Sequence, residues 1–281
     1  MVSVQQVKKE YCLGNSENAL LMLEKQGQLF SGLTRDLLVR AGIGPGMRVL
    51  DFGAGAGDVS ILASELVGSR GEVVAIERDP NAIEHARLRI QNRKIHNIRF
   101  VQGDESVLPE IMGEQHLDAL VGRNVLCHQP DPIATLCNLV NFVRPGGIVA
   151  FHDMDPMGKF WSIPSLPLFE STFNLALETF RQGGAALDMR TRLVQAFDKA
   201  GITDRRIISE GLIETGPNSL AYEWLSSAMK TLLPLMVKKG ITTEKELDIE
   251  TLADRLRDEA VQARAFFSPI NLVGAFGHTK G

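Results

Sequence analysis

Residues 49–57 read VLDFGAGAG, and this stretch decides the fold. It lies where a short apolar strand ending at Phe52 gives way to a helix that begins at Asp58. The glycines between them, Gly53, Gly55 and Gly57, permit a tight turn. They also remove the Cβ atoms that would keep a ligand away from the backbone. The stretch therefore predicts a strand, a ligand-binding loop and a helix in direct succession.

Strands and helices continue to alternate from this loop as far as residue 155. Short apolar strands separated by helices of about three turns are typical of βαβ units and a parallel sheet. We therefore expect an α/β protein whose doubly wound, mostly parallel sheet has helices on both faces. The expected strands are Arg48–Phe52, Glu72–Glu77, Ile98–Gln102, Leu117–Gly122 and Ile148–His152, and the expected helices are Asp58–Val67, Pro80–Asn92 and Pro132–Val143.

The flanking segments predict helices around this sheet. Residues 1–45 have apolar side chains at helical spacing and predict two or three short helices. Beyond residue 155 we expect helices over Leu168–Arg181, Leu187–Ala200, Ser219–Val237 (broken by Pro234) and Glu250–Ala263, and two last strands over Arg205–Leu212 and Ile270–Phe276. The expected units are an N-terminal helical lid (1–46), a core (47–155), and cap helices with the last two strands completing the same domain (156–281).

Bulk composition narrows the class of protein. The formal net charge of -4 and the interspersed acids and bases give no reason to expect a nucleic-acid partner. The first residues have no apolar signal core, and no apolar run reaches the length of a membrane span. Cys12, Cys127 and Cys137 form no metal-binding pattern. These features predict a soluble, cytoplasmic protein without a metal, and its extra helices make a homodimer plausible.

Acidic residues around the glycine loop indicate the kind of ligand. A dinucleotide fingerprint would place glycine where Asp58 stands, whereas Asp51 before the loop suits a ligand that carries an ammonium group. Glu77 ends the second strand, where a carboxylate can accept hydrogen bonds from ribose hydroxyls. Gly103 and Asp104 follow the third strand, where the carboxylate can accept from an adenine amino group. Together these residues favour S-adenosylmethionine (SAM), which has a sulfonium and an amino-acid end.

The run from Arg48 to Asp155 resembles the core of the SAM-dependent methyltransferases with a Rossmann-like fold. The resemblance includes the glycine loop, the Glu77 and Gly103-Asp104 strand ends, and residues 122–132, which are similar to the small-molecule branch that methylates quinones or natural products. It implies a seven-stranded sheet whose last strand is antiparallel. It also implies SAM across the first strands, with Tyr11 and the N-terminal helices over it and with Arg123 and Asn124 among the cofactor-binding residues. The family usually has Asp where this chain has Glu77, and it often has Cys where this chain has Ala54.

Methyl transfer from a sulfonium depends mainly on positioning, although a weakly acidic acceptor also benefits from a base. His128 after the fourth strand and His152 at the end of the fifth strand are the candidate catalytic residues. Asp153, Phe160 and Trp161 are candidate substrate contacts, and the aromatic residues of the cap favour an apolar or aromatic metabolite. A catechol-type metal site would need an acid after the fourth strand, where Arg123 and Asn124 stand. We therefore expect no metal, and S-adenosylhomocysteine (SAH) as the product.

Three other functions stay open on the sequence alone. A protein of the same fold can bind SAM and catalyse a rearrangement or decarboxylation. Glu77 is also compatible with a nicotinamide oxidoreductase, although Asp58 disfavours one. A SAM-sensing module without catalysis would keep the same cofactor residues. The sequence does not indicate whether the acceptor atom is O, N or C.

Overall fold

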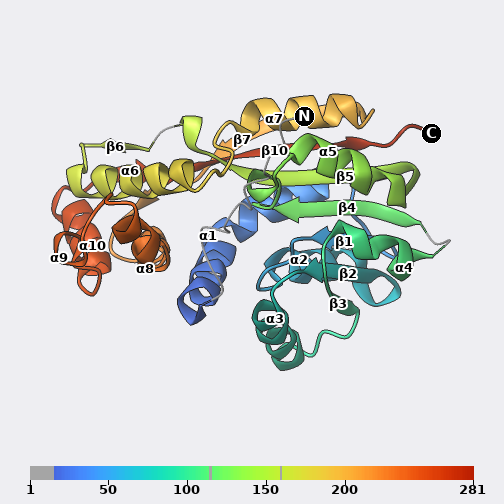
Figure 1. Ribbon diagram of the computed structural model, residues 1–281, viewed down its shortest axis with the longest axis horizontal. Helices are drawn as coiled ribbons and strands as arrows, with labels where there is room; N and C mark the ends of the chain where they lie inside the picture. The colour runs from blue at the N-terminus through green and yellow to red at the C-terminus, as the bar shows by residue number, and fades with distance from the viewer. Residues whose placement is uncertain (1–15, 114–115, 159) are drawn as a thin grey trace, which may run out of the picture.

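The computed structural model describes residues 16–113, 116–158 and 160–281 (Figure 1). Its main sheet has seven strands in the order β3-β2-β1-β4-β5-β10-β7. The first five are parallel to one another, whereas β10 is antiparallel to both of its neighbours, β5 and β7. The predicted α/β fold is confirmed, including the antiparallel last strand. The strands are β1 (Arg48–Phe52), β2 (Glu72–Glu77), β3 (Ile98–Gln102), β4 (Leu117–Arg123), β5 (Val143–Asp155), β7 (Thr203–Gly211) and β10 (Asn271–His278).

Helices cover both faces of this sheet. Successive side chains of β1 point into two different cores. Val49 packs in the core formed with α1 (Glu17–Ala41), α2 (Asp58–Val67) and α3 (Pro80–Asn92). Leu50 packs with the helices of the other face. Those are α4 (Leu108–Met112), α5 (Pro132–Leu139) and α7 (Met189–Lys199). A parallel strand between two helical layers must be apolar on both faces, which explains the uninterrupted apolar runs in the sequence.

Two or three short helices were expected over residues 1–45, and the described part of that segment forms a single helix of 25 residues, α1. The Ser16 side chain accepts from Ala19 N at its start, and Gly42 ends it with φ of 95°. The helix is long because it has two partners. Its last turns, with Leu37 and Leu38, pack on the main sheet, and its first half, with Met22 and Phe30, packs against other helices.

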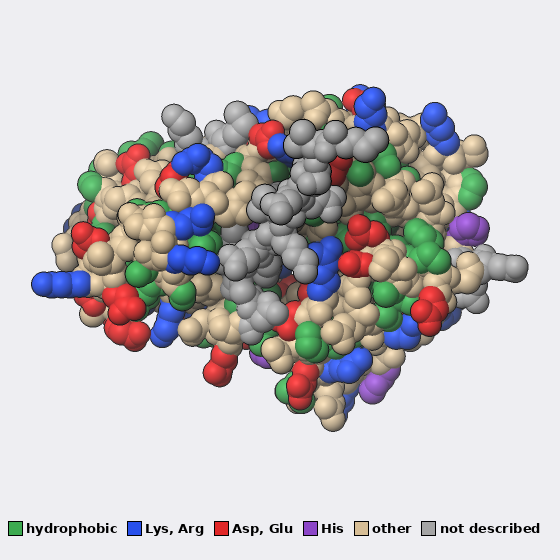
Figure 2. Space-filling view, viewed as in Figure 1, with side chains coloured by type: hydrophobic (Ala, Val, Ile, Leu, Met, Phe, Trp, Pro, Cys, Tyr) green, Lys and Arg blue, Asp and Glu red, His purple; other side chains and the backbone are tan. Residues whose placement is uncertain are grey.

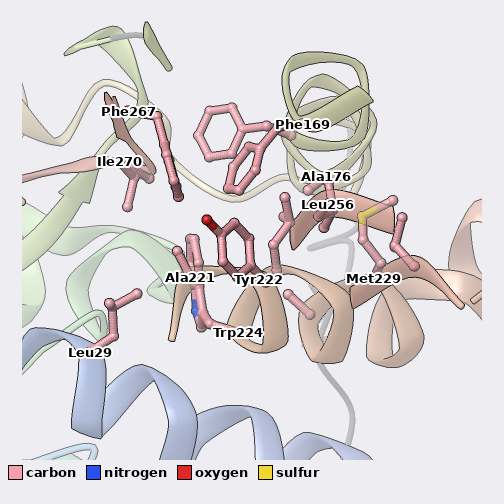
Figure 3. Packing of buried hydrophobic residues seen from close by; sticks show 14 of the residues in the cluster. Leu29, Phe169, Ala176, Ala221, Tyr222, Trp224, Met229, Leu256, Phe267 and Ile270 are labelled. Atoms are coloured by element: carbon pink, nitrogen blue, oxygen red, sulfur yellow. The ribbon is translucent and has the colours of Figure 1, made fainter. Parts of the chain in front are cut away.

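Those other helices form a helical cap beside the sheet (Figure 1). The helical cap comprises α6 (Pro167–Gln182), α8 (Ala221–Lys238), α9 (Glu244–Leu247), α10 (Leu252–Gln262) and a small antiparallel sheet, β6 (Trp161–Ile163), β9 (Phe266–Ser268) and β8 (Glu214–Thr215). Figure 3 shows its own core, in which Tyr222 of α8 lies near Phe169 of α6 and Phe267 of β9, whereas Trp224 of α8 lies toward Leu29 of α1. The small sheet is absent from the sequence expectation, because strands of two or three residues have no readable period.

Several element boundaries also differ from expectation. The helix α8 continues through Pro234, because Leu232 and Met236 on either side are anchored in the cap core. The helix α5 ends at Leu139 and a 3₁₀ turn, Val140–Phe142, leads directly into a longer β5. On the face shown in Figure 2, acidic and basic side chains are interspersed. No described helix is long and apolar enough to cross a membrane.

Candidate active site

A cavity of about 400 Å³ lies at the carboxyl ends of β1, β2 and β4, between the main sheet, α1 and the helical cap. One half, the cofactor half, is lined by the glycine loop, the ends of β2 and β3, and α1. The other half, the acceptor half, is lined by residues 125–129, β5, α6 and α8. The cofactor half includes Gly53, Ala54, Gly55, Glu77, Arg78, Gly103, Asp104, Arg123 and Asn124. The acceptor half includes Cys127, His128, Met154, Phe173, Ala176, Leu177, Phe180, Ala185, Ala186, Trp224, Leu225 and Ala228.

The glycine loop needs its glycines for conformation and for space. Gly53, Gly55 and Gly57 have φ of 72°, 52° and 81°, in the left-handed region that other residues rarely adopt. A Cβ at position 53 would come within 2.3 Å of Val125 Cγ2. A Cβ at position 55 would lie 3.4 Å from Leu23 Cδ1 of α1, on the cavity wall. The loop therefore brings bare backbone to the cavity.

Glu77 fixes this loop as well as facing the cavity. Its Oε2 accepts from Gly55 N at 2.8 Å, and its Oε1 accepts from Arg78 N at 2.7 Å and Asp79 N at 3.0 Å. A carboxylate offers about four acceptor positions, so about one is left for a ligand hydroxyl. The acid at the end of β2 thus joins the loop after β1 to the loop after β2.

Asp104 lies at the neighbouring strand end. Its Oδ1 accepts from Ser106 Oγ at 2.6 Å and Ser106 N at 3.0 Å, and Oδ2 lies 3.9 Å from Arg78 Nε. The hydrogen bonds from Ser106 hold the pKa of Asp104 below its ordinary value. Its carboxylate is therefore an acceptor at neutral pH.

Asp51 lies beneath the loop rather than in the cavity wall. It is buried, its Oδ2 accepts from Ser60 Oγ at 2.5 Å, and its Oδ1 has no partner among the described residues. Burial raises the pKa of Asp51 to about 7, against the opposing effects of Ser60 and Arg123. A buried carboxyl with one oxygen left without a partner is destabilising, which is typical of a functional position.

An ionic network ties α1 over the cofactor half. Asp58 Oδ1 lies 2.8 Å from Arg89 Nη2, and Asp58 Oδ2 lies 4.0 Å from Arg123 Nη2. Arg89 Nε in turn lies 3.2 Å from Glu24 Oε1 of α1. Arg123 also donates from Nη1 to Thr34 Oγ1 of α1 at 3.2 Å. The residue that replaces a fingerprint glycine, Asp58, is thus an anchor for the covering helix.

Comparison with known proteins agrees with this geometry. Residues 43–199, more than half of the chain, match the family model described as a methyltransferase domain. The chain belongs to the SAM-dependent methyltransferase family. A demethylmenaquinone methyltransferase of Lactococcus lactis is 29% identical over 158 residues, which are 56% of this chain and 58% of that protein. Across four curated relatives the chain spans 30% to 58% of their length.

Solved structures share the fold of this methyltransferase. The YcgJ protein of Bacillus subtilis has a TM-score of 0.57 at 16% identity, covering 89% of this chain and 99% of that one. A phosphoethanolamine N-methyltransferase of Haemonchus contortus, in complex with phosphomonomethylethanolamine and SAH, has a TM-score of 0.56 at 14% identity. That match covers 95% of this chain and 58% of the other.

Most cofactor residues predicted for the methyltransferase line one cavity. Gly53, Gly55, Glu77, Gly103, Asp104, Arg123 and Asn124 all do so. Asn124 has φ of 51° and is pinned by two hydrogen bonds, from its N to His152 O and from Met154 N to its Oδ1, both 2.8 Å. Asp51 lies one layer deeper, and Tyr11 lies outside the described residues.

Of the two candidate catalytic histidines, one lines the cavity and the other does not. His128 lines the acceptor half, with its ring centroid 6.4 Å from that of Phe180. His152 does not line the cavity; it is buried against α1, 3.3 Å from Nδ1 to Thr34 Oγ1. Burial and the nearby Arg123 charge lower the pKa of His152 to about 3, so the ring is neutral. The alternation of β5 directs His152 toward α1 and away from the acceptor.

Asp153, Phe160 and Trp161 are also absent from the cavity wall. Asp153 is fully buried on the opposite side of β5 from His152. Phe160 stacks on Phe169 in the cap core, with centroids 4.8 Å apart and planes at 11°. Trp161 lies on the small sheet, 38% exposed. The unexpected pairing of β6 with β9 carries these aromatic residues away from the cavity.

The cap aromatic residues of the sequence analysis include two that line the acceptor half, Phe173 and Trp224, whereas the other residues that line it from α6 and α8 were missed. Phe173, Ala176, Leu177 and Phe180 come from one face of α6, and Trp224, Leu225 and Ala228 from one face of α8. Their helical spacing was readable in the sequence, but it predicts only a buried face. Among the described residues no group of three or more His, Cys, Asp or Glu side chains could hold a metal ion.

Proposed function

We propose that this methyltransferase binds SAM in the cofactor half of the cavity and methylates a small apolar or aromatic acceptor in the other half. The observation that carries the proposal is the convergence of the glycine loop, Glu77 and Asp104 on one wall of a cavity whose opposite wall is apolar. Such a cavity suits a ligand with one polar and one reactive end next to an apolar second ligand.

The residues present fit SAM. Bare backbone at Gly53 and Gly55 gives close access, and Glu77 keeps about one acceptor position for a ribose hydroxyl. Asp104 would accept from the adenine amino group. The buried Asp51, whose Oδ1 has no partner among the described residues, would supply negative potential beneath the ammonium end of the ligand when it is ionised. When bound, SAM supplies a methyl group on a sulfonium, an electrophile that a nucleophile attacks in line.

The chain's own contribution is positioning and exclusion of water. Residues Leu23 and Gln26 of α1 close the cavity from one side, and Trp224 and Leu225 of α8 close it from the other. Asn124, held by two backbone contacts, fixes the loop between the two halves. We assign α1 as a lid and the helical cap as the acceptor-binding part. Holding two reactants in one geometry supplies much of the rate of such a displacement.

The acceptor half favours an uncharged, planar molecule. Its walls from α6 and α8 are apolar, and His128 and Gln129 are polar side chains at the strand edge among the described lining residues. We assign His128 to contact the acceptor near its nucleophilic atom. The similarity to a demethylmenaquinone methyltransferase supports a quinone-like aromatic acceptor.

Isothermal titration with SAM, SAH and NADH tests the cofactor assignment. We expect micromolar binding of SAM and SAH and none of NADH, whereas binding of NADH alone would overturn the proposal. Transfer of labelled methyl from SAM to a panel of naphthoquinols and phenols, with SAH formation measured in parallel, then tests the reaction. SAM binding without SAH formation on any class of small-molecule acceptor would favour a non-methylating relative.

Gly55→Val is the informative variant for the site. It places a branched side chain on the cavity wall at a left-handed position. Gly46→Val is the matched control, because Gly46 has φ of 83° and a Cβ there meets nothing within 4 Å. Both variants place valine at a left-handed φ, so only loss of SAM binding specific to Gly55→Val supports the assignment. Equal affinity in the two variants would contradict it.

A further inference from the structure

One polar side chain lies on the apolar face that α1 turns toward the helical cap. Met22, Leu29 and Phe30 on this face are buried in the cap core, and Figure 3 shows Leu29 on the side of α1 that faces Trp224 of α8. Gln26 stands among them and is only 6% exposed. Burying an amide among apolar side chains costs free energy unless the amide has hydrogen-bond partners.

The side-chain amide of Gln26 has no hydrogen-bond partner among the described residues. Neither its nitrogen nor its oxygen is among the described polar atoms that are cut off from accessible space. Gln26 lines the cavity, together with Ala19, Met22 and Leu23 of the same helix. The open space that the amide faces is therefore the cavity, and the partner that it lacks is a ligand.

The helix places Gln26 at the junction between the two halves of the cavity. Three residues before it, Leu23 faces the glycine loop, where a Cβ on Gly55 would lie 3.4 Å from Leu23 Cδ1. Four residues before it, Met22 packs in the cap core. Residues three and four apart share one face of a helix, so Gln26 lies between the cofactor loop and the cap. In the proposed function, this is the region where the acceptor meets the SAM methyl group.

We propose that Gln26 selects the acceptor by hydrogen bonding to a hydroxyl group on its ring. A glutamine amide has an oxygen that accepts and an N–H group that donates. A hydroxyl group satisfies both, because its O–H donates to Oε1 and its oxygen accepts from Nε2. A hydrocarbon ring would leave the buried amide unpaired. The assignment narrows the acceptor to a phenol or quinol, and it rests on the proposed function.

The amino-acid end of the cofactor is the other candidate partner for Gln26. The ammonium group of SAM is assigned to the end above Asp51. The carboxylate of SAM only accepts hydrogen bonds, so it would pair with Gln26 Nε2 and leave Oε1 without a donor. The hydroxylated acceptor therefore matches the amide better. SAH has the same carboxylate, so its affinity distinguishes the two assignments.

Two ring compounds of similar shape test the preference for a hydroxyl group. 1-Naphthol has a hydroxyl group where 1-methylnaphthalene has a methyl group. Each is titrated calorimetrically into the SAH complex of the wild type and of Gln26→Met, an apolar replacement of similar size. We expect the ratio of the 1-naphthol affinity to the 1-methylnaphthalene affinity to fall at least about tenfold in the variant. A ratio within about threefold of the wild-type value, or no binding of 1-naphthol to the wild type, would overturn the proposal.

Gln28→Met is the matched control, because Gln28 lies on the same helix but is exposed and does not line the cavity. It should keep the wild-type affinity ratio, and an equal fall of the ratio in both variants would contradict the assignment. Thermal unfolding of the free proteins tests a purely structural role. Removal of an unpaired buried amide should leave the melting temperature of Gln26→Met at or above that of the wild type. A lower melting temperature would mean that the amide has a partner within the protein, and the proposal would fall.

Titration of SAH alone keeps this proposal apart from the proposed function. We expect SAH affinities of the wild type and Gln26→Met within about threefold of each other. A loss of about tenfold or more would assign Gln26 to the cofactor and overturn its role toward the acceptor. SAH binding without a hydroxyl preference would overturn the role of Gln26 and leave the cofactor assignment standing. A hydroxyl preference that depends on Gln26, in a protein that binds no SAH, would leave that role standing and contradict the proposed function.

Discussion

Gly27 of α1 lies directly over Asp58 of α2, so that a Cβ at position 27 would come within 2.2 Å of the Asp58 carboxyl carbon. The Asp58 side chain is held in this position, because Arg89 Nη2 lies 2.8 Å from its Oδ1. The packing of the covering helix on the start of α2 thus depends on a residue without a side chain.

Gly27→Ala should therefore lift α1 from the loop. We expect weaker SAM binding, by about tenfold or more, and lower thermal stability. Gly32→Ala is the control on the same helix: a Cβ there meets nothing within 4 Å, and the better helix former should stabilise the protein by about 0.5–1 kcal/mol. Calorimetric titration and thermal unfolding of both variants check this, and equal behaviour of the two would contradict it.

Glu77→Ala should weaken SAM binding by roughly 1–3 kcal/mol through loss of charge-assisted hydrogen bonds. Because Glu77 also accepts from Gly55 N, the loop should loosen even without ligand. Glu77→Asp, the family's more usual acid, is the matched comparison and should recover part of the affinity. Titration with SAH measures both. An affinity of Glu77→Ala within a few-fold of the wild type would show that Glu77 is not the ribose ligand.

Asp51→Asn should make the protein more stable. The raised pKa of Asp51, about 7 against 3.8 ordinarily, means that the folded state holds a proton that the unfolded chain releases above pH of about 4. The contribution of Asp51 to stability therefore falls as pH rises through this range. We expect the variant to melt at least about 2 °C higher than the wild type at pH 8, with the gain shrinking toward pH 4.

Thermal unfolding of both proteins between these pH values measures the effect, and SAM titration should show reduced affinity of Asp51→Asn. A melting difference that does not change with pH would mean that Asp51 carries no proton in the folded state.

Ala185→Phe should fill the acceptor half without touching the cofactor half. Ala185 is half-buried in the segment between α6 and α7 and lines the cavity there. We expect methyl transfer to fall by more than about tenfold while SAH affinity stays within a few-fold of wild type. The SAH titration is the internal control. Unchanged transfer to the acceptor would place the acceptor elsewhere.

Most strands and helices of the main sheet region could be predicted from local sequence. The bounds of β1, β2 and β3, and of α2 and α3, are those predicted. A glycine follows β1, β3 and α2, and α3 begins with the Asp79 cap and Pro80. The glycine loop, Glu77 and Asp104 were predictable for a related reason. In a parallel sheet the carboxyl ends of successive strands meet at one edge, so their positions along the chain determine which side chains converge.

The other half of the cavity depended on contacts between distant segments. The helical spacing of apolar residues predicts that one face of α6 and of α8 is buried. Only the packed structure shows that part of that face borders a cavity instead of a core. The pairing of β6 with β9 likewise decided that Phe160 joins the cap core, and the pleat of β5 decided that His152 and Asp153 face opposite layers.

The sequence by itself determined the α/β sheet, the cofactor loop and the acids around it, because these depend on residues close together along the chain. Only the tertiary structure decided that α1 is one helix bridging two cores, that Asp58 anchors it, and that Gln26 borders the cavity. Those features arise from side chains far apart along the chain. Thr34 and Arg123, for example, are 89 residues apart, and their contact exists only once the layers have packed.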